Sequence, residues 1–168
     1  MAIVESKAYV LHQRPYRESS VLVDLLTAEN GRLAAVCKGV RGGGKRAALL
    51  RGGLQPFTLI KVEWTGKSEL KSLRSAEALS VSPQLSQQFL YAAMYVNELM
   101  VRLFQAGEAH EHLFVSYKEV IETIVRGNSM LIRSTSKADQ EGERLVSDSA
   151  SGEQQLQVAL RYFEFQLL

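Results

Sequence analysis

The spacing of the apolar residues changes at about residue 80, and this change constrains the fold more than any other feature. Before that point, short runs alternate apolar and polar residues, which is the pattern of strands with one buried face. After it, apolar residues recur at spacings of four and three, as on one side of an amphipathic helix. These residues are Leu85, Phe89, Ala92, Val96, Leu99 and Leu103. The chain has 168 residues, enough for two small domains. We therefore predict an α+β protein with a β-rich domain over residues 1–80 and a helical domain over residues 81–168.

Five strands are expected in the first domain, each bounded by turn-forming residues. They cover residues 7–13, 20–27, 32–38, 57–64 and 69–77. Asn30-Gly31 favours a tight hairpin, and the turn at Arg14-Pro15 is expected to end the first strand. One long connection, residues 39–53, joins the third strand to the fourth. Five strands in this arrangement favour an OB-type β-barrel over a sandwich, which usually needs seven strands or more.

The second domain is expected to contain three helices and a linker. Ser82 and Pro83 suit the cap and first position of one helix, and a second is expected over residues 109–126, with Gly127-Asn128 as its stop. Ser, Thr, Gly and charged residues fill 15 of the 20 positions from 133 to 152, which is typical of a flexible linker. The third helix begins near Glu153 and its pattern breaks off at the C-terminus, so the helical domain is expected to be incomplete.

The two halves differ in charge. Residues 1–80 contain 13 Lys and Arg against 7 Asp and Glu, a net charge of +6, whereas residues 81–168 contain 7 against 11, a net charge of −4. A basic half of this kind is typical of a module that binds polyanions. Five cations with no acid between them fall in a glycine-rich stretch that we expect to be a flexible loop following a phosphate backbone. They are Lys38, Arg41, Lys45, Arg46 and Arg51. A merely solvated loop is the alternative.

Aromatic residues lie among these cations, as in barrels that stack bases and neutralise phosphates. Tyr16, beside a proline, is expected at the surface, and Trp64, next to a turn, suits either the core or a stacking surface. The complete predicted DNA-binding set is Arg14, Arg17, Lys38, Arg41, Lys45, Arg46, Arg51, Lys71, Arg74, Tyr16 and Trp64.

Catalysis is not expected. Gly39 to Lys45 match most of the phosphate-loop pattern, but Arg46 stands where a Ser or Thr hydroxyl would bind Mg²⁺. No nucleophile elbow, no His-Glu-x-x-His and no paired catalytic carboxylates occur, so we expect no enzyme activity, cofactor or metal. The single cysteine, Cys37, and the lack of a signal or membrane-spanning segment indicate a reducing, cytoplasmic location without a membrane partner.

Several segments resemble one known family. Residues 9–20, 25–32, 38–41, 54–58, 69–77 and 95–99 are, in their order and spacing, similar to the N-terminal part of the bacterial DNA-repair protein family RecO. Members of that family usually extend further at the C-terminal end, so the chain is expected to be a C-terminally shortened member.

The resemblance implies a recombination mediator that is not an enzyme. Its relatives have an N-terminal OB fold and a helical domain, bind single- and double-stranded DNA and anneal complementary strands. They work with RecR and single-stranded-DNA-binding protein to help load RecA. The alternative from another class is an OB-fold module that binds a protein partner and has no DNA activity.

Overall fold

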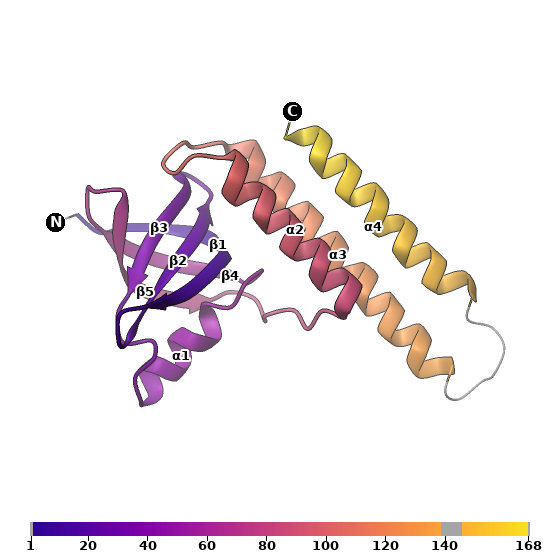
Figure 1. Cartoon of the computed structure of the whole chain (residues 1–168), viewed down its shortest axis with the longest axis horizontal. Helices are drawn as coiled ribbons and strands as arrows, with labels where there is room; N and C mark the ends of the chain where they lie inside the picture. Colours follow the sequence, from indigo (N-terminus) through magenta and orange to yellow (C-terminus); the bar gives the residue numbers. More distant parts are fainter. Residues whose placement is uncertain (1, 139–145, 168) are drawn as a thin grey trace. The chain divides into compact units, whose positions relative to one another are not determined.

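The N-terminal strands form a closed barrel (Figure 1). The computed structural model describes residues 2–138 and 146–167. The strands are β1 (Val4–Tyr16), β2 (Ser20–Thr27), β3 (Gly31–Cys37), β4 (Leu59–Thr65) and β5 (Leu70–Ala78). Their order around the barrel is β1-β2-β3-β5-β4, and helix α1 (Lys45–Gly53) connects β3 to β4. The predicted five-stranded OB-type barrel is confirmed.

One strand pair differs from the others. β1–β2, β2–β3, β4–β5 and β1–β4 are antiparallel, whereas β3 and β5 run parallel, from Ala34 opposite Leu70 to Cys37 opposite Leu73. A parallel pair needs a crossover connection, and here α1 and β4 provide it. Closure of the ring removes the unpaired edges that an open five-stranded sheet would expose.

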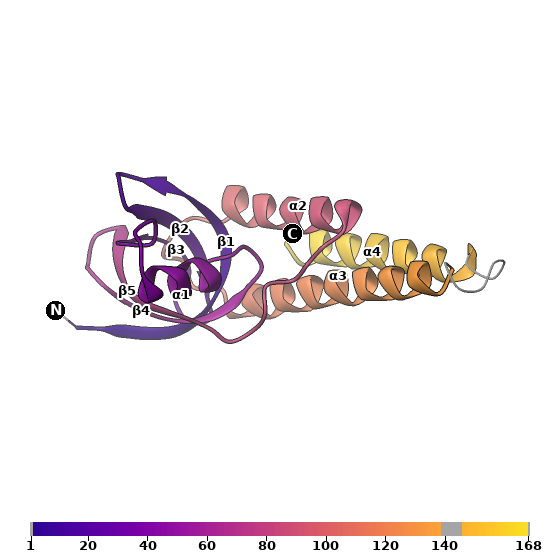
Figure 2. The same ribbon diagram turned by 90° about the horizontal axis from the view of Figure 1, so that it is seen from below.

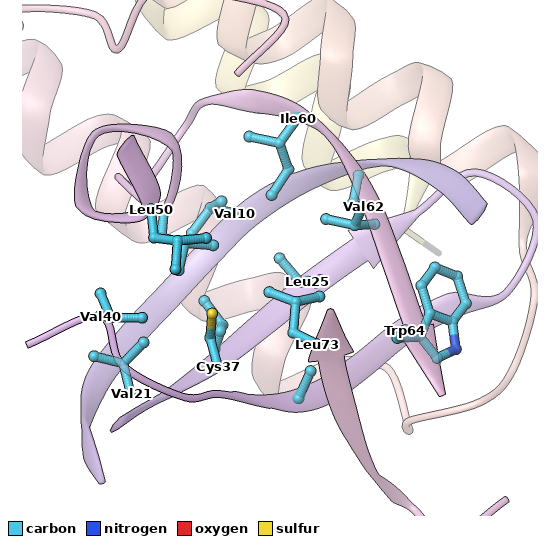
Figure 3. Packing of buried hydrophobic residues seen from close by; sticks show 14 of the residues in the cluster. Val10, Val21, Leu25, Cys37, Val40, Leu50, Ile60, Val62, Trp64 and Leu73 are labelled. Atoms are coloured by element: carbon cyan, nitrogen blue, oxygen red, sulfur yellow. The ribbon is translucent and has the colours of Figure 1, made fainter. Parts of the chain in front are cut away.

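The barrel is filled by side chains that alternate along each strand (Figure 3). On β4, Ile60, Val62 and Trp64 point inward, and Leu73 of β5 joins them. The crossover contributes Val40 and Leu50 to the same cluster. Burial of such side chains stabilises a fold by about 1.5–3 kcal/mol each. The core therefore fixes both the strands and the segment between β3 and β4.

Helix α1 corrects the expectation of a flexible loop over residues 39–53. Its sequence, Lys-Arg-Ala-Ala-Leu-Leu-Arg-Gly-Gly, has good helix formers at its centre. Ala47, Leu50 and the following Leu54 lie three and four positions apart, so they share one face and are all buried. Only residues 38–44 remain outside regular structure, since burial of this face holds the rest as a helix.

The first strand also extends further than expected. β1 continues through Arg14 and Pro15, which lie opposite Leu22 and Val21 of β2. The residue before a proline is restricted to extended conformations, which a strand satisfies as well as a turn. The chain turns only after Tyr16, at Arg17, whose φ is 53°.

The chain divides into two compact units. The first comprises residues 1–83 and 97–114, and the second comprises residues 84–96 and 115–168. Helices α2 (Gln87–Leu103) and α3 (Glu111–Ala138) contribute to both units, and α4 (Val146–Gln166) belongs to the second. Among the described residues, no helix has the length and apolar character needed to cross a lipid bilayer.

Residues 97–114 join the first unit through Arg32 on β3. Its Nε donates a hydrogen bond to the carbonyl oxygen of Phe104 (2.9 Å), and its Nη1 pairs with Asp24 (3.3 Å). The Gly107 amide donates to the Arg32 carbonyl (2.8 Å), and the Asn97 amide group donates to the Leu11 carbonyl. The connection between α2 and α3 is thus fastened to the barrel strands.

In the second unit, Gly127 marks a close approach of helices that run side by side (Figure 2). A Cβ at Gly127 would lie 2.9 Å from Cε1 of Phe89 on α2 and 3.7 Å from the carbonyl oxygen of Gly152 on α4. The predicted stop at Gly127-Asn128 is therefore wrong, because α3 continues to Ala138. A glycine inside a helix costs about 1 kcal/mol, which packing against two helices offsets.

Asn128 fixes the start of α2. Its Oδ1 accepts hydrogen bonds from the backbone amide and the hydroxyl of Ser86 (2.7 Å each), and its Nδ2 donates to the Gln84 carbonyl (2.9 Å). These bonds hold the preceding residues outside the helix, so α2 begins at Gln87 and the expected start at Ser82-Pro83 is wrong.

The region expected to be a linker contains helical residues at both ends. Residues 133–138 belong to α3 and residues 146–152 belong to α4, while residues 139–145 lie outside the described part of the chain. Helices propagate cooperatively once a turn has formed, so polar composition alone did not end them.

Replacing Gly127 with alanine should lower the free energy of unfolding by up to about 2 kcal/mol. Overpacking costs about 1–3 kcal/mol, and the higher helix propensity of alanine offsets about 1 kcal/mol of this. Gly52→Ala is the matched control, since Gly52 is also helical but a Cβ there meets no atom within 4 Å. This control should gain about 0.5–1 kcal/mol. Urea denaturation followed by circular dichroism measures both, and shifts in the same direction would contradict the packing role.

Candidate nucleic-acid interface

Two loops meet at one end of the barrel. Tyr16 lies opposite Ser20, and Val21 lies opposite Cys37, so the β1–β2 turn and the end of β3 flank the start of β2. The Arg41 amide donates a hydrogen bond to the Ser19 carbonyl (3.0 Å), and the Arg41 side chain donates to the Arg17 carbonyl (3.4 Å). The turn and the β3–α1 loop are therefore joined to each other.

Six of the predicted cations lie on these two loops or directly beside them, at the end of β1 and in the first turn of α1, and we call this surface the cationic end. Its members, all exposed, are Arg14, Arg17, Lys38, Arg41, Lys45 and Arg46. Within the described residues, none of the six forms an ion pair with a carboxylate. Unpaired cations drawn from three neighbouring segments produce a positive potential, which attracts polyanions.

Tyr16 and Arg17 form a stacked pair at the β1–β2 turn. The guanidinium carbon of Arg17 lies 5.2 Å from the centre of the Tyr16 ring, within cation–π range. The Tyr16 ring is half-buried, and Arg14, two residues earlier, shares its face of the strand. A partly exposed aromatic residue therefore lies among cations, and its role in stacking bases stays a prediction.

The start of α1 combines an uncapped helix end with two cationic side chains. Gly44 precedes the helix with a φ of 95° and provides no capping side chain, and the first turn contains no acidic residue. The first backbone amides of a helix have no partner within it and carry partial positive charge. Lys45 and Arg46 occupy this first turn, so side-chain and main-chain charges at the cationic end have the same sign.

Arg51 has a different environment from the six cations. It stands in the last turn of α1, and its Nη1 donates hydrogen bonds to the carbonyl oxygens of Val40 (2.8 Å) and Gly42 (2.9 Å). Its own carbonyl accepts a bond from Gln55 Nε2 (2.8 Å). The side chain thus connects the helix to the β3–α1 loop.

Three further residues of the predicted DNA-binding set are not members of the cationic end. Trp64 is 3% exposed within the core, so its assignment as a stacking surface is wrong. Its inward direction follows from its position two residues after Val62, which the sequence already contained.

Lys71 and Arg74 lie on β5. Lys71 Nζ donates to the Ser68 carbonyl (2.7 Å) in the β4–β5 turn, which adjoins the start of β1, far along that strand from Tyr16. Arg74 is exposed and donates to Thr65 Oγ1 (3.4 Å). It follows Leu73, the partner of Cys37, and so lies beside the end of β3.

Sequence reasoning missed the main-chain groups of the site. The Ser19 carbonyl accepts the hydrogen bond that joins the two loops, and the first amides of α1 have no side-chain cap. A backbone contact between loops 22 residues apart cannot be predicted from residue types, and it is seen only in the folded barrel.

Cys37 lies beneath the cationic end. Its side chain is 2% exposed, and burial raises the pKa of the Cys37 thiol from 9.0 to about 11, while the cation of Arg46 opposes part of that rise. The thiol is therefore neutral at pH 7 and serves as a packing group.

A closed five-stranded barrel with cations, an aromatic ring and helix amides at one end defines an OB-fold protein with a surface suited to polyanions. Residues 1–81 match the family model described as "Recombination protein O N terminal". The chain belongs to the RecO family.

Three relatives illustrate the similarity, each named "DNA repair protein RecO". The protein of Pasteurella multocida is 38% identical over 162 residues, which cover 96% of this chain and 56% of that protein. Those of Erwinia tasmaniensis and Yersinia pestis are 45% and 42% identical over 118 residues. These matches cover 70% of this chain and 47% and 48% of the two relatives. The chain spans about half the length of the curated relatives it matches.

The stability of the barrel should fall between pH 9 and 11 because of Cys37. A raised folded-state pKa stabilises the fold fully below the unfolded value of 9.0, and the contribution disappears as the pH rises to about 11. The loss amounts to about 2–3 kcal/mol. Urea denaturation of the wild type and of Cys37→Ala at pH 8 and pH 11 tests this. The difference between the two proteins should change with pH, and parallel curves would refute the assignment.

Proposed function

We propose that this chain binds nucleic acid through the cationic end of its barrel. The observation that supports the proposal is that Arg41 joins two loops at the end of the barrel where the six exposed cations lie, and that none of the six pairs with a carboxylate of the described residues. Phosphate groups are the anions that a nucleic acid presents in regular succession. Neutralising them releases condensed counterions, which favours binding to any sequence.

Both single strands and duplexes are substrates under this proposal. Phosphate contacts from Lys45, Arg46 and the first amides of α1 serve either form, since they read no bases. The Tyr16 ring adds a contact available only to an unpaired base, because bases in a duplex are already stacked. Single strands are therefore expected to gain from one more interaction than duplexes.

The biological role proposed for the chain is that of a recombination mediator in DNA repair. The family and the names of its relatives support this role. A cationic surface reduces the repulsion between two phosphate backbones, which is the physical requirement for annealing complementary strands. Partnership with RecR, with single-stranded-DNA-binding protein and, through them, with RecA follows from the resemblance of the sequence to this family.

No catalytic step is part of the proposal. The groups collected at the cationic end are guanidinium and ammonium ions, one phenol ring and backbone amides, which bind anions and bases. Cys37, the nearest thiol, is buried and neutral, so it is not an activated nucleophile. Arg46 provides no hydroxyl for Mg²⁺ at the start of α1.

The salt dependence of binding tests the cationic end. If five of its six cations contact phosphates, log K for a single strand should fall with log[salt] at a slope of about −3.5. The double variant Lys45→Ala/Arg46→Ala should reduce the slope by about 1.4, at about 0.7 per contact. Fluorescence anisotropy at several salt concentrations measures this.

The control for this experiment is Lys61→Ala/Lys67→Ala. It makes the same change in charge on β4 and its turn, where Lys61 pairs with Glu5 (2.9 Å), and should leave the slope unchanged. Equal effects of both double variants would show that net charge alone matters. If the wild type binds a protein partner but no DNA at low salt, the chain is an interaction module instead.

Replacing Tyr16 with alanine should weaken single-strand binding by about 1–3 kcal/mol, the usual contribution of one stacked base. Duplex binding should change little, and Tyr16→Phe, which keeps the ring, should behave as the wild type. Anisotropy titrations with a labelled oligonucleotide, alone and annealed, measure the difference. An equal loss on both substrates would exclude a stacking role.

A further inference from the structure

We infer that Arg51 is a positioning residue that orders the β3–α1 loop for nucleic-acid binding and does not itself contact phosphate. The inference rests on the proposed function of the cationic end. It reassigns one of the cations that the sequence places in the binding set.

The geometry of the Arg51 side chain supports this role. An Nη amino group has two N–H donors, and Nη1 points one at the Val40 carbonyl (2.8 Å) and the other at the Gly42 carbonyl (2.9 Å). Hydrogen bonds from a charged donor are about twice as strong as neutral ones. One side chain thus holds both residues next to Arg41, which bears one of the cations of the site.

Arg51 is itself held in place from both directions. Leu50, the preceding residue, is buried in the barrel core, and the Arg51 carbonyl accepts a bond from Gln55. Val40 is 1% exposed in the same core. The hydrogen bonds of Arg51 therefore connect the anchored end of α1 to the anchored start of the loop. The segment between these two ends contains three glycines, Gly42 to Gly44.

The consequence for binding is preorganisation. Glycines lose more conformational freedom on ordering than other residues, and a mobile loop would lose it when nucleic acid binds. With Arg51 in place, the Arg41 amide stays on the Ser19 carbonyl, and the two loops present their cations together. Loss of Arg51 weakens affinity without removing a phosphate contact.

Amide hydrogen exchange of the full chain tests the inference without any nucleic acid. The Arg41 amide, bonded to Ser19, and the Gly42 amide, bonded to Gly39, report on the order of the loop. In Arg51→Gln both should exchange about tenfold faster or more, because two charge-assisted hydrogen bonds are lost. Arg46→Gln, the same change on the same helix, should leave both rates unaltered. Unaltered rates in Arg51→Gln would overturn the inference.

Binding to a labelled single strand at several salt concentrations provides the second readout. Arg46→Gln should reduce the salt slope by about 0.7, whereas Arg51→Gln should lower affinity at every salt concentration with the slope unchanged. Arg51→Lys keeps the charge but not the planar fork, so it should resemble Arg51→Gln. Full rescue by lysine, or a slope reduced by about 0.7 in Arg51→Gln, would identify a phosphate contact and overturn the inference. If the wild type binds no DNA, the proposed function fails, and the exchange rates still decide the role of Arg51 in the loop.

Discussion

The parallel pairing of β3 with β5 is the constraint on which the rest of the first unit depends. Parallel neighbours cannot be joined by a hairpin, so the chain must leave the end of β3 and return to the barrel through α1 and β4. That departure begins at Lys38, beside the β1–β2 turn, which is where the basic stretch starts. The place of the cations is thus a consequence of barrel closure, and Leu50 and Val40 fix it by entering the core (Figure 3).

Local sequence patterns predicted most of the barrel. The alternation of apolar residues located four strands to within about two residues at each end, because one face of each is buried. It failed at Pro15, where the restriction on Arg14 suits a strand as well as a turn. It also left Trp64 undecided, although its spacing from Val62 assigns it to the core. Both errors arise when a residue is assigned from its type alone, without its position in the alternating pattern of the strand.

The parts that the sequence did not predict depend on contacts between distant residues. The helix at Lys45 to Gly53 is stable because its buried face meets the barrel, which composition does not reveal. Gly127 resembles a helix stop until Phe89 is placed 2.9 Å from its missing Cβ. Arg51 resembles the other cations until Val40 and Gly42 are seen to accept its hydrogen bonds. In each case the sequence shows the residue type, but it does not show the distant residues that this residue contacts.

The hydrogen bonds between Asn128 and Ser86 affect how the second unit folds and unfolds. The two residues are 42 positions apart, so the start of α2 is set by a side chain that arrives on a different helix. A separate peptide with the sequence of α2 would lack this anchor, and its first turn would fray. Within the chain, we therefore expect the start of α2 and the middle of α3 to form and unfold together as a single cooperative unit.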